Sequence, residues 1–154
     1  MRTPGARAPR ALAGLVVLAL LPLAAGCGGD STDDYCSAVK DHQTELTEIT
    51  TGDGQDSLIR ALDIFKDLQD KSPGDISDEW QQVVSRIEAL DEALRDADVD
   101  PATYDRAHPP EGLSEEDRSR IDAAARELGS GPTLAALQAL DQEARDVCQT
   151  PLSL

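Results

Sequence analysis

The chain contains no asparagine and only four aromatic residues, which are Tyr35, Phe65, Trp80 and Tyr104. Without asparagine there is no acceptor for an N-linked glycan. Surfaces that bind sugars usually stack aromatic rings on the apolar faces of the sugar, so this small supply argues against a carbohydrate-binding module. Signals for β-hairpins are also missing, since no pair of alternating apolar runs is joined by a short turn of the required residue types.

Positively charged residues are few, because 14 Lys and Arg stand against 30 Asp and Glu, for a formal net charge of −16. Proteins that bind nucleic acid carry a basic footprint, so we predict no nucleic-acid partner. The same charge disfavours contact of the folded domain with anionic lipid. An acidic excess keeps a protein soluble and selects cationic partners. Since Arg greatly outnumbers Lys and Ala and Asp abound, we interpret this excess as the composition of a GC-rich genome.

Known catalytic and metal-binding motifs are absent from the sequence. It contains no H-E-x-x-H, G-x-S-x-G, phosphate-binding or dinucleotide-binding pattern. The acidic run at 96–100 resembles the opening of an EF-hand loop, but Pro101 stands where glycine is needed and Ala107 where the bidentate Glu is needed. His108 has no further ligand at zinc-site spacing. We therefore predict no enzyme activity, no cofactor and no metal site.

The beginning of the chain has the pattern of a secretory signal. Three arginines precede an apolar run at Ala11–Ala25, which ends in small residues directly before Cys27. The run is too short to cross a bilayer core of about 30 Å as a helix, and Pro22 interrupts its end. We predict a signal peptide over residues 1–26. Its removal would leave 128 residues with a net charge of −19, because the removed segment contains three Arg and no acid.

The cysteine directly after the small residues resembles the signal of bacterial lipoproteins. That family prefers a branched aliphatic residue three positions before the cysteine, where this chain has Ala24, with Leu23 one position earlier. The resemblance implies that Cys27 carries lipid, becomes the first residue after cleavage and anchors the protein to the outer face of the cell membrane. The alternative is an ordinary signal peptide with Cys27 as an incidental thiol. Cys36 and Cys148 can pair with each other, which leaves Cys27 available for lipid.

Helical periodicity follows over almost the whole remaining chain. Residues 28–34 are predicted to be a short polar tether, so that 27–34 joins the lipid to a helical domain over 35–150. Apolar residues at steps of three and four predict five helices, with Ser77 or Asp75 as N-cap of the third and Ser114 with Asp117 resembling a capping box before the fourth. The expected helices cover roughly 32–51, 58–68, 80–94, 114–128 and 132–148. The fold class is therefore all-α, a four- to five-helix bundle closed by one disulfide between the first and last helices.

The cysteine positions constrain the order of these helices. Cys36 lies in the first turn of the first predicted helix and Cys148 in the last turn of the last one. A disulfide needs these two ends to lie within about 7 Å, which strict up-and-down alternation of five helices would prevent. The irregular segment at 98–113 is long enough to cross the bundle and reset the direction. We predict that the first, third and fourth helices run parallel and the second and fifth run back.

Three residues are candidates for a binding site. His42 lies on the apolar stripe of the first predicted helix, and Asp91 lies on that of the third. They could line an internal pocket, form a polar pair in the core, or Asp91 could reach solvent at the edge of its stripe. Trp80 is either a core residue at the start of its helix or a contact for a partner protein.

The turn at 72–79, Trp80, the Tyr35-Cys36 pair and the late cysteine together resemble small actinobacterial lipoproteins of unknown function. This resemblance implies a helical envelope protein closed by a disulfide and carries no catalytic residues. We predict a non-enzymatic binding or interaction module, anchored to the membrane and able to bind an envelope protein. The alternatives are a small-ligand-binding lipoprotein with an internal pocket and, least favoured, a hydrolase that uses scattered carboxylates.

Overall fold

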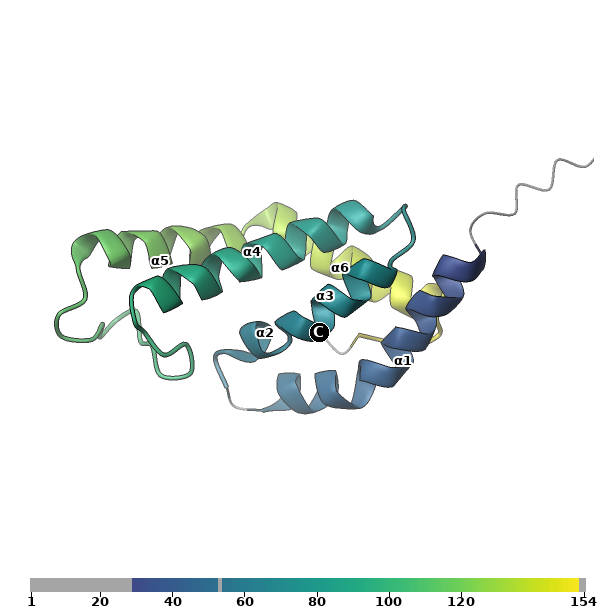
Figure 1. Cartoon of the computed structure of the whole chain (residues 1–154), viewed down its shortest axis with the longest axis horizontal. Helices are drawn as coiled ribbons and strands as arrows, with labels where there is room; N and C mark the ends of the chain where they lie inside the picture. The colour runs from purple at the N-terminus through teal and green to yellow at the C-terminus, as the bar shows by residue number, and fades with distance from the viewer. Residues whose placement is uncertain (1–28, 53, 153–154) are drawn as a thin grey trace, which may run out of the picture.

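A computed structural model of the chain describes residues 29–52 and 54–152, so the predicted signal peptide and Cys27 lie outside the described residues. Within those ranges the chain forms six helices and no strand, which confirms the all-α fold class (Figure 1). The helices are α1 (Gly29–Thr51), α2 (Ser57–Arg60), α3 (Leu62–Lys71), α4 (Ser77–Asp96), α5 (Glu115–Leu128) and α6 (Gly131–Asp146).

Several helix ends differ from those predicted. Helix α1 begins at Gly29, inside the segment predicted to be a tether. The second predicted helix is divided at Ala61 into the single turn of α2 and the longer α3. Ser77 is the first residue of α4 and does not cap it, because its hydroxyl donates a hydrogen bond to the carbonyl oxygen of Gly74 at 3.1 Å. The N-cap position belongs to Ile76, whose side chain offers no cap.

Helices α4 and α5 form an antiparallel pair, which the two ion pairs between them show. Arg120 near the start of α5 lies 3.4 Å from Asp96 at the end of α4, and Arg86 in the first half of α4 lies 3.8 Å from Glu127 near the end of α5. The prediction that these two helices run parallel is therefore wrong. Residues 97–114 turn back at one end of the molecule and do not cross its length (Figure 1).

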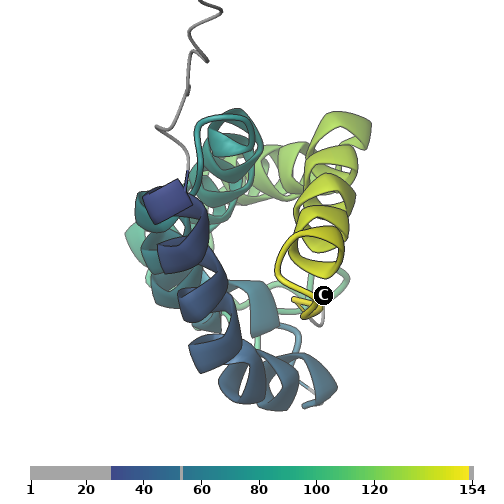
Figure 2. The same ribbon diagram turned by 90° about the vertical axis from the view of Figure 1, so that its right-hand side faces the viewer.

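The two consecutive helices that keep one direction are α5 and α6, and not the two helices joined by the long segment. Only two residues separate these helices, and α6 continues away from the 97–114 end (Figure 1). This brings Cys148, just after α6, to Cys36 on α1, and the disulfide between them is confirmed with a Cα–Cα distance of 4.9 Å. Figure 2 shows α1 and α6 on the two sides of this end of the molecule.

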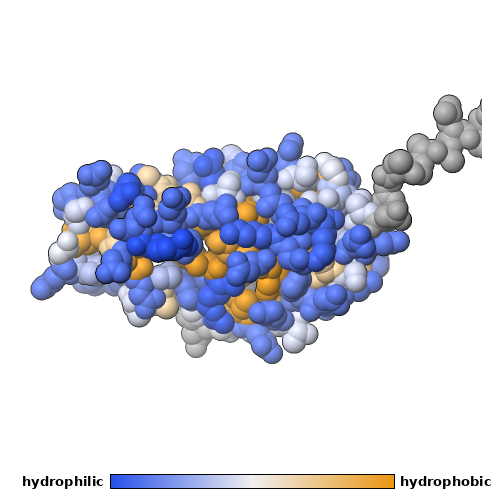
Figure 3. All heavy atoms as spheres, in the orientation of Figure 1, coloured by the Kyte–Doolittle hydropathy of each residue, from blue (hydrophilic) through white to orange (hydrophobic). Residues whose placement is uncertain are grey.

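The buried residues form two hydrophobic clusters. The larger cluster joins α1, α2, α3, the first part of α4 and α6, and its largest fully buried side chains are Trp80, Tyr35 and Phe65. The smaller cluster is centred on Leu94 and Ile121 and lies where the end of α4, helix α5 and the 97–114 segment meet. Hydrophilic residues cover most of the face seen in Figure 3, and hydrophobic residues show between them. The two clusters give the domain a large core at one end and a small one at the other.

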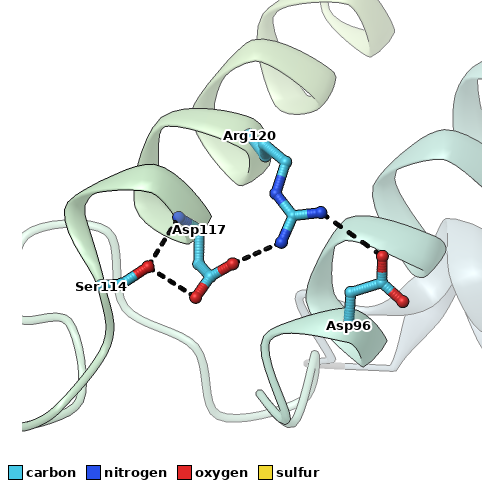
Figure 4. A network of polar contacts seen from close by, with 4 residues as sticks. All are labelled: Asp96, Ser114, Asp117 and Arg120. Atoms are coloured by element: carbon cyan, nitrogen blue, oxygen red, sulfur yellow. Dashed lines mark hydrogen bonds and ion pairs between the residues drawn. The ribbon is translucent and has the colours of Figure 1, made fainter.

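Helix α5 begins at the cap that the sequence predicts. The hydroxyl of Ser114 accepts a hydrogen bond from the backbone nitrogen of Asp117 at 3.0 Å and also lies 2.6 Å from the Asp117 carboxylate (Figure 4). Arg120 pairs with the other oxygen of Asp117 and bridges to Asp96 of α4. The hydrogen bond from Ser114, followed by that from Arg120, lowers the pKa of Asp117. The cap and the α4–α5 contact are thus one polar network.

Replacing Ser114 with alanine is expected to lower the free energy of unfolding by about 1 kcal/mol, because the helix loses the acceptor for one of its free N–H groups. Urea unfolding followed by circular dichroism measures this change. Ser119→Ala is the matched control, since Ser119 is exposed within the same helix. An equal loss in both variants would show that the cap contributes nothing.

Candidate functional site

His42 lies in a polar cluster between α1 and α3. Its Nε2 is 2.9 Å from Oδ2 of Asp67, and Lys71 pairs with the same carboxylate. The hydrogen bond from Lys71, followed by that from His42, lowers the pKa of Asp67. Because this pKa is lower in the folded protein than in the unfolded chain, the contacts stabilise the fold above the ordinary carboxyl range and this contribution is lost as the pH falls. The side chains are partly exposed, so the contribution is small.

The structure does not bring His42 and Asp91 together. Asp91 pairs with Arg95, one turn later on α4. Helix α3 packs against both α1 and α4, and its Asp67 is the carboxylate that His42 contacts. His42 and Asp91 therefore have separate partners, Asp67 and Arg95, and do not form a site with each other.

Trp80 is a fully buried core residue. Its ring lies 6.4 Å from that of Tyr35 in an edge-to-face arrangement and 5.7 Å from that of Phe65, measured between ring centroids. Burial raises the pKa of Tyr35 to about 12, so its phenol stays protonated at neutral pH. The sequence left two roles open for Trp80, a core residue or a contact for a partner protein. The structure places it in the core, where its ring presents no surface to a partner.

A pocket of about 310 Å³, partly open to solvent, lies against the smaller hydrophobic cluster. Its walls come from α2, α4, α5 and the 97–114 segment. The lining residues are Gln55, Ile59, Leu90, Leu94, Pro101, Tyr104, Asp105, Arg106, Ile121 and Ala125. Pockets of this size and apolar character are typical of sites for small molecules. None of the lining residues is a serine, cysteine, histidine or lysine, so the pocket supplies none of the usual nucleophiles of covalent catalysis apart from a carboxylate and a phenol.

The irregular wall of this pocket is held by specific hydrogen bonds. The side-chain amide of Gln55 donates to the carbonyl oxygens of Ala102 at 3.1 Å and Tyr104 at 3.0 Å. The backbone nitrogens of Thr103 and Tyr104 donate to the carbonyl oxygen of Asp100, which forms a single helical turn in this segment. These contacts tie the segment to the connection between α1 and α2, so the pocket is formed without a ligand.

The charged residues at the pocket already have partners. Nε of Arg106 lies 2.9 Å from Asp122 of α5. The carboxylate of Asp105 lies 2.8 Å from the His108 ring and accepts a hydrogen bond from the Ala107 backbone nitrogen. The hydrogen bond from His108 and then that from Ala107 lower the pKa of Asp105, which keeps it ionised. The polar rim is therefore close to neutral, in contrast to the acidic chain as a whole.

The hydroxyl of Tyr104 is an exception, because it is buried and has no hydrogen-bond partner among the described residues. Leaving a buried hydroxyl unpaired costs about 1–3 kcal/mol. Tyr104 therefore lines the pocket with a hydroxyl group that no other described residue satisfies.

The acidic run at 96–100 has structural roles. Asp98 adopts a left-handed conformation with φ of 55° and ends α4, because its nitrogen donates to Arg95 and the next nitrogen donates to Leu94. The Asp100 carboxylate accepts a hydrogen bond from the nitrogen of Ala102. Across the described ranges no group of three or more His, Cys, Asp or Glu side chains is arranged to hold a metal ion.

No pattern in the sequence predicted these residues as a site, because the 98–113 segment was predicted only to be an irregular connection that crosses the bundle, and Tyr104 was noted only as one of four aromatic residues. No family model, curated protein or solved structure matches the chain. None of the helices that the structure describes has the length and apolar character needed to cross a membrane.

Proposed function

We propose that the chain is a lipid-anchored lipoprotein at the outer face of the cell membrane, whose helical domain is a non-enzymatic binding module. The disulfide between Cys36 and Cys148 carries this proposal. Disulfides persist in oxidising compartments and are rare in the cytosol, so the bond supports an extracytoplasmic domain. It also leaves Cys27 as the third cysteine of the chain, free for lipid.

The sequence before the folded domain supports the anchor. The apolar run and the small residues before Cys27 resemble a lipoprotein signal. An acyl chain adds about 0.8 kcal/mol of membrane affinity per buried CH₂, so two or more chains hold a protein that is otherwise repelled by anionic lipid. A domain with so large an acidic excess needs such an anchor to stay at a membrane that contains anionic lipid.

The pocket beside Tyr104 favours one form of binding, namely that of a small molecule. Its walls are mostly apolar, its irregular side is held in place and its volume is about 310 Å³. A pocket that exists without a ligand lowers the cost of ordering on binding. A protein partner on the domain surface is the second form, but the residue singled out for it, Trp80, is buried.

Changing Cys27 to alanine is expected to abolish membrane anchoring. Expressed in full length in a bacterial host, the parent chain should enter the detergent phase of a Triton X-114 extract. Intact mass spectrometry should show it beginning at Cys27 with the added mass of acyl chains. The variant should carry no lipid, because the acylated sulfur is gone.

Cys148→Ala is the matched control, since it removes a cysteine of the domain and should keep the lipid. The anchor is contradicted if the parent chain begins at another residue or lacks acyl mass. It is equally contradicted if the Cys27 variant, once cleaved, still enters the detergent phase.

A further inference from the structure

We infer that the pocket beside Tyr104 binds a small uncharged molecule of about the size of two fused rings, apolar over most of its surface and carrying one hydrogen-bonding group. This inference names the ligand class of the proposed binding module and to that extent rests on the proposed function. Three properties of the pocket carry it, namely its volume, the neutrality of its rim and the unpaired hydroxyl in its wall.

The volume sets the size of the ligand. An apolar protein cavity of about 150 Å³ admits one benzene molecule. The pocket of about 310 Å³ has roughly twice that capacity. Its aliphatic walls, among them Ile59, Leu90, Leu94 and Ile121, come from three helices and offer contacts on several sides of a flat molecule.

The charges at the rim disfavour an ionised ligand. Arg106 is paired with Asp122, and the Asp105 carboxylate is hydrogen-bonded to the His108 ring, so each lining charge already has a partner. A charged group that entered the pocket would lose its hydration and find no partner. The rest of the chain is strongly acidic and would repel an anion before it arrived. An uncharged molecule meets neither obstacle.

The Tyr104 hydroxyl is the reason why we assign one hydrogen-bonding group to the ligand. It is buried and has no hydrogen-bond partner among the described residues, and its residue lines the pocket in a segment without regular helix. Pairing with a ligand therefore requires the Tyr104 side chain to turn so that its hydroxyl faces the lumen. A phenol both donates and accepts, so a hydroxyl or a carbonyl group on the ligand would pair with it.

Naphthalene and 2-naphthol are the matched probes, since they differ by one hydroxyl group. The protein is residues 29–154 secreted behind an ordinary cleavable signal, because both hydrophobic clusters and the disulfide lie within residues 35–152. Titration followed by ¹H–¹⁵N NMR should show saturable binding of both probes, with 2-naphthol bound about three- to tenfold more tightly. The shifted amides should cluster around residues 55–59, 90–94, 101–106 and 121–125.

Three variants locate the site. Ala125→Trp fills the pocket and should weaken the binding of both probes at least tenfold. Ala125→Leu should weaken their binding to a smaller extent, and it replaces the tryptophan variant if that variant does not fold. Ala123→Trp is the matched control on an exposed position of the same helix and should bind as the parent chain does. Tyr104→Phe should leave the affinity for naphthalene unchanged and remove the preference for 2-naphthol.

The inference is overturned if neither probe binds saturably, if Ala125→Leu and Ala125→Trp bind as well as the parent, or if Tyr104→Phe keeps the preference for 2-naphthol. Equal weakening by the Ala123 and Ala125 variants would also overturn it, because binding would then not depend on this pocket. The secreted domain carries no lipid, so failure here leaves the test of the Cys27 anchor unaffected, and failure of that test leaves the pocket titration unaffected.

Discussion

Replacing Trp80 with alanine is expected to lower the free energy of unfolding by about 4 kcal/mol. The indole is fully buried and packs against the rings of Tyr35 and Phe65, so its removal opens a large cavity in the main cluster. A domain of this size has about 5–15 kcal/mol of stability in total. Trp80 is the only tryptophan, so far-ultraviolet circular dichroism during urea unfolding must follow the change.

Leu134→Ala is the control for this prediction, because Leu134 is a large apolar residue that is 48% exposed on α6. Its replacement should change stability by no more than about 0.5 kcal/mol. If Trp80→Ala were as mild as Leu134→Ala, the indole would not be a core residue. The earlier alternative, a surface contact for a partner, would then return.

The parts of the fold that the sequence predicted are those with local causes. Val39, Leu46 and Ile49 are seven and three positions apart, which places them on one face of a helix, and all three are buried. The Ser114 cap depends on residues three positions apart, and it was predicted correctly. The second hydrogen bond of a full capping box is absent from this pair. The Asp117 carboxylate accepts a hydrogen bond from the Ser114 hydroxyl, whereas the longer Glu of a full capping box would accept one from the backbone nitrogen of the cap residue.

The direction of α5 could not be predicted from local pattern. The length of the 98–113 segment is compatible both with crossing the bundle and with turning back. The choice depends on contacts such as Arg106 with Asp122 and Gln55 with the Ala102 carbonyl, which join residues that are 16 and 47 positions apart. The chain begins to turn back at Asp98, which adopts the left-handed conformation. Aspartate adopts this conformation more often than most residues but in few positions, so the sequence alone does not predict it.

In the candidate site, too, the sequence predicts local features and not the contacts between distant residues. His42 is partly buried on α1, its partner is Asp67, and no spacing in the sequence relates the two. The pocket is made from four separate stretches of chain, each contributing two to four ordinary side chains. Such a site has no motif, because its specificity lies in shape and in one unpaired hydroxyl. Tyr104 was visible beforehand only as one of four aromatic residues, placed in the one long irregular segment.

Removing the disulfide should have an effect as large as the loss of Trp80. In the secreted chain of residues 29–154, the double variant Cys36→Ser, Cys148→Ser is expected to lose about 4 kcal/mol of unfolding free energy. The bond joins residues 112 positions apart, and a closed loop of that length strongly restricts the unfolded chain. Guanidinium unfolding followed by circular dichroism measures the difference.

Reduction supplies the control for this last experiment. Treating the parent domain with a reductant should bring its stability to that of the double variant, while the double variant itself should not respond. A loss of less than about 1 kcal/mol would mean that packing alone holds the start of α1 against the end of α6. The contribution expected from closing a loop between residues 112 positions apart would then be contradicted.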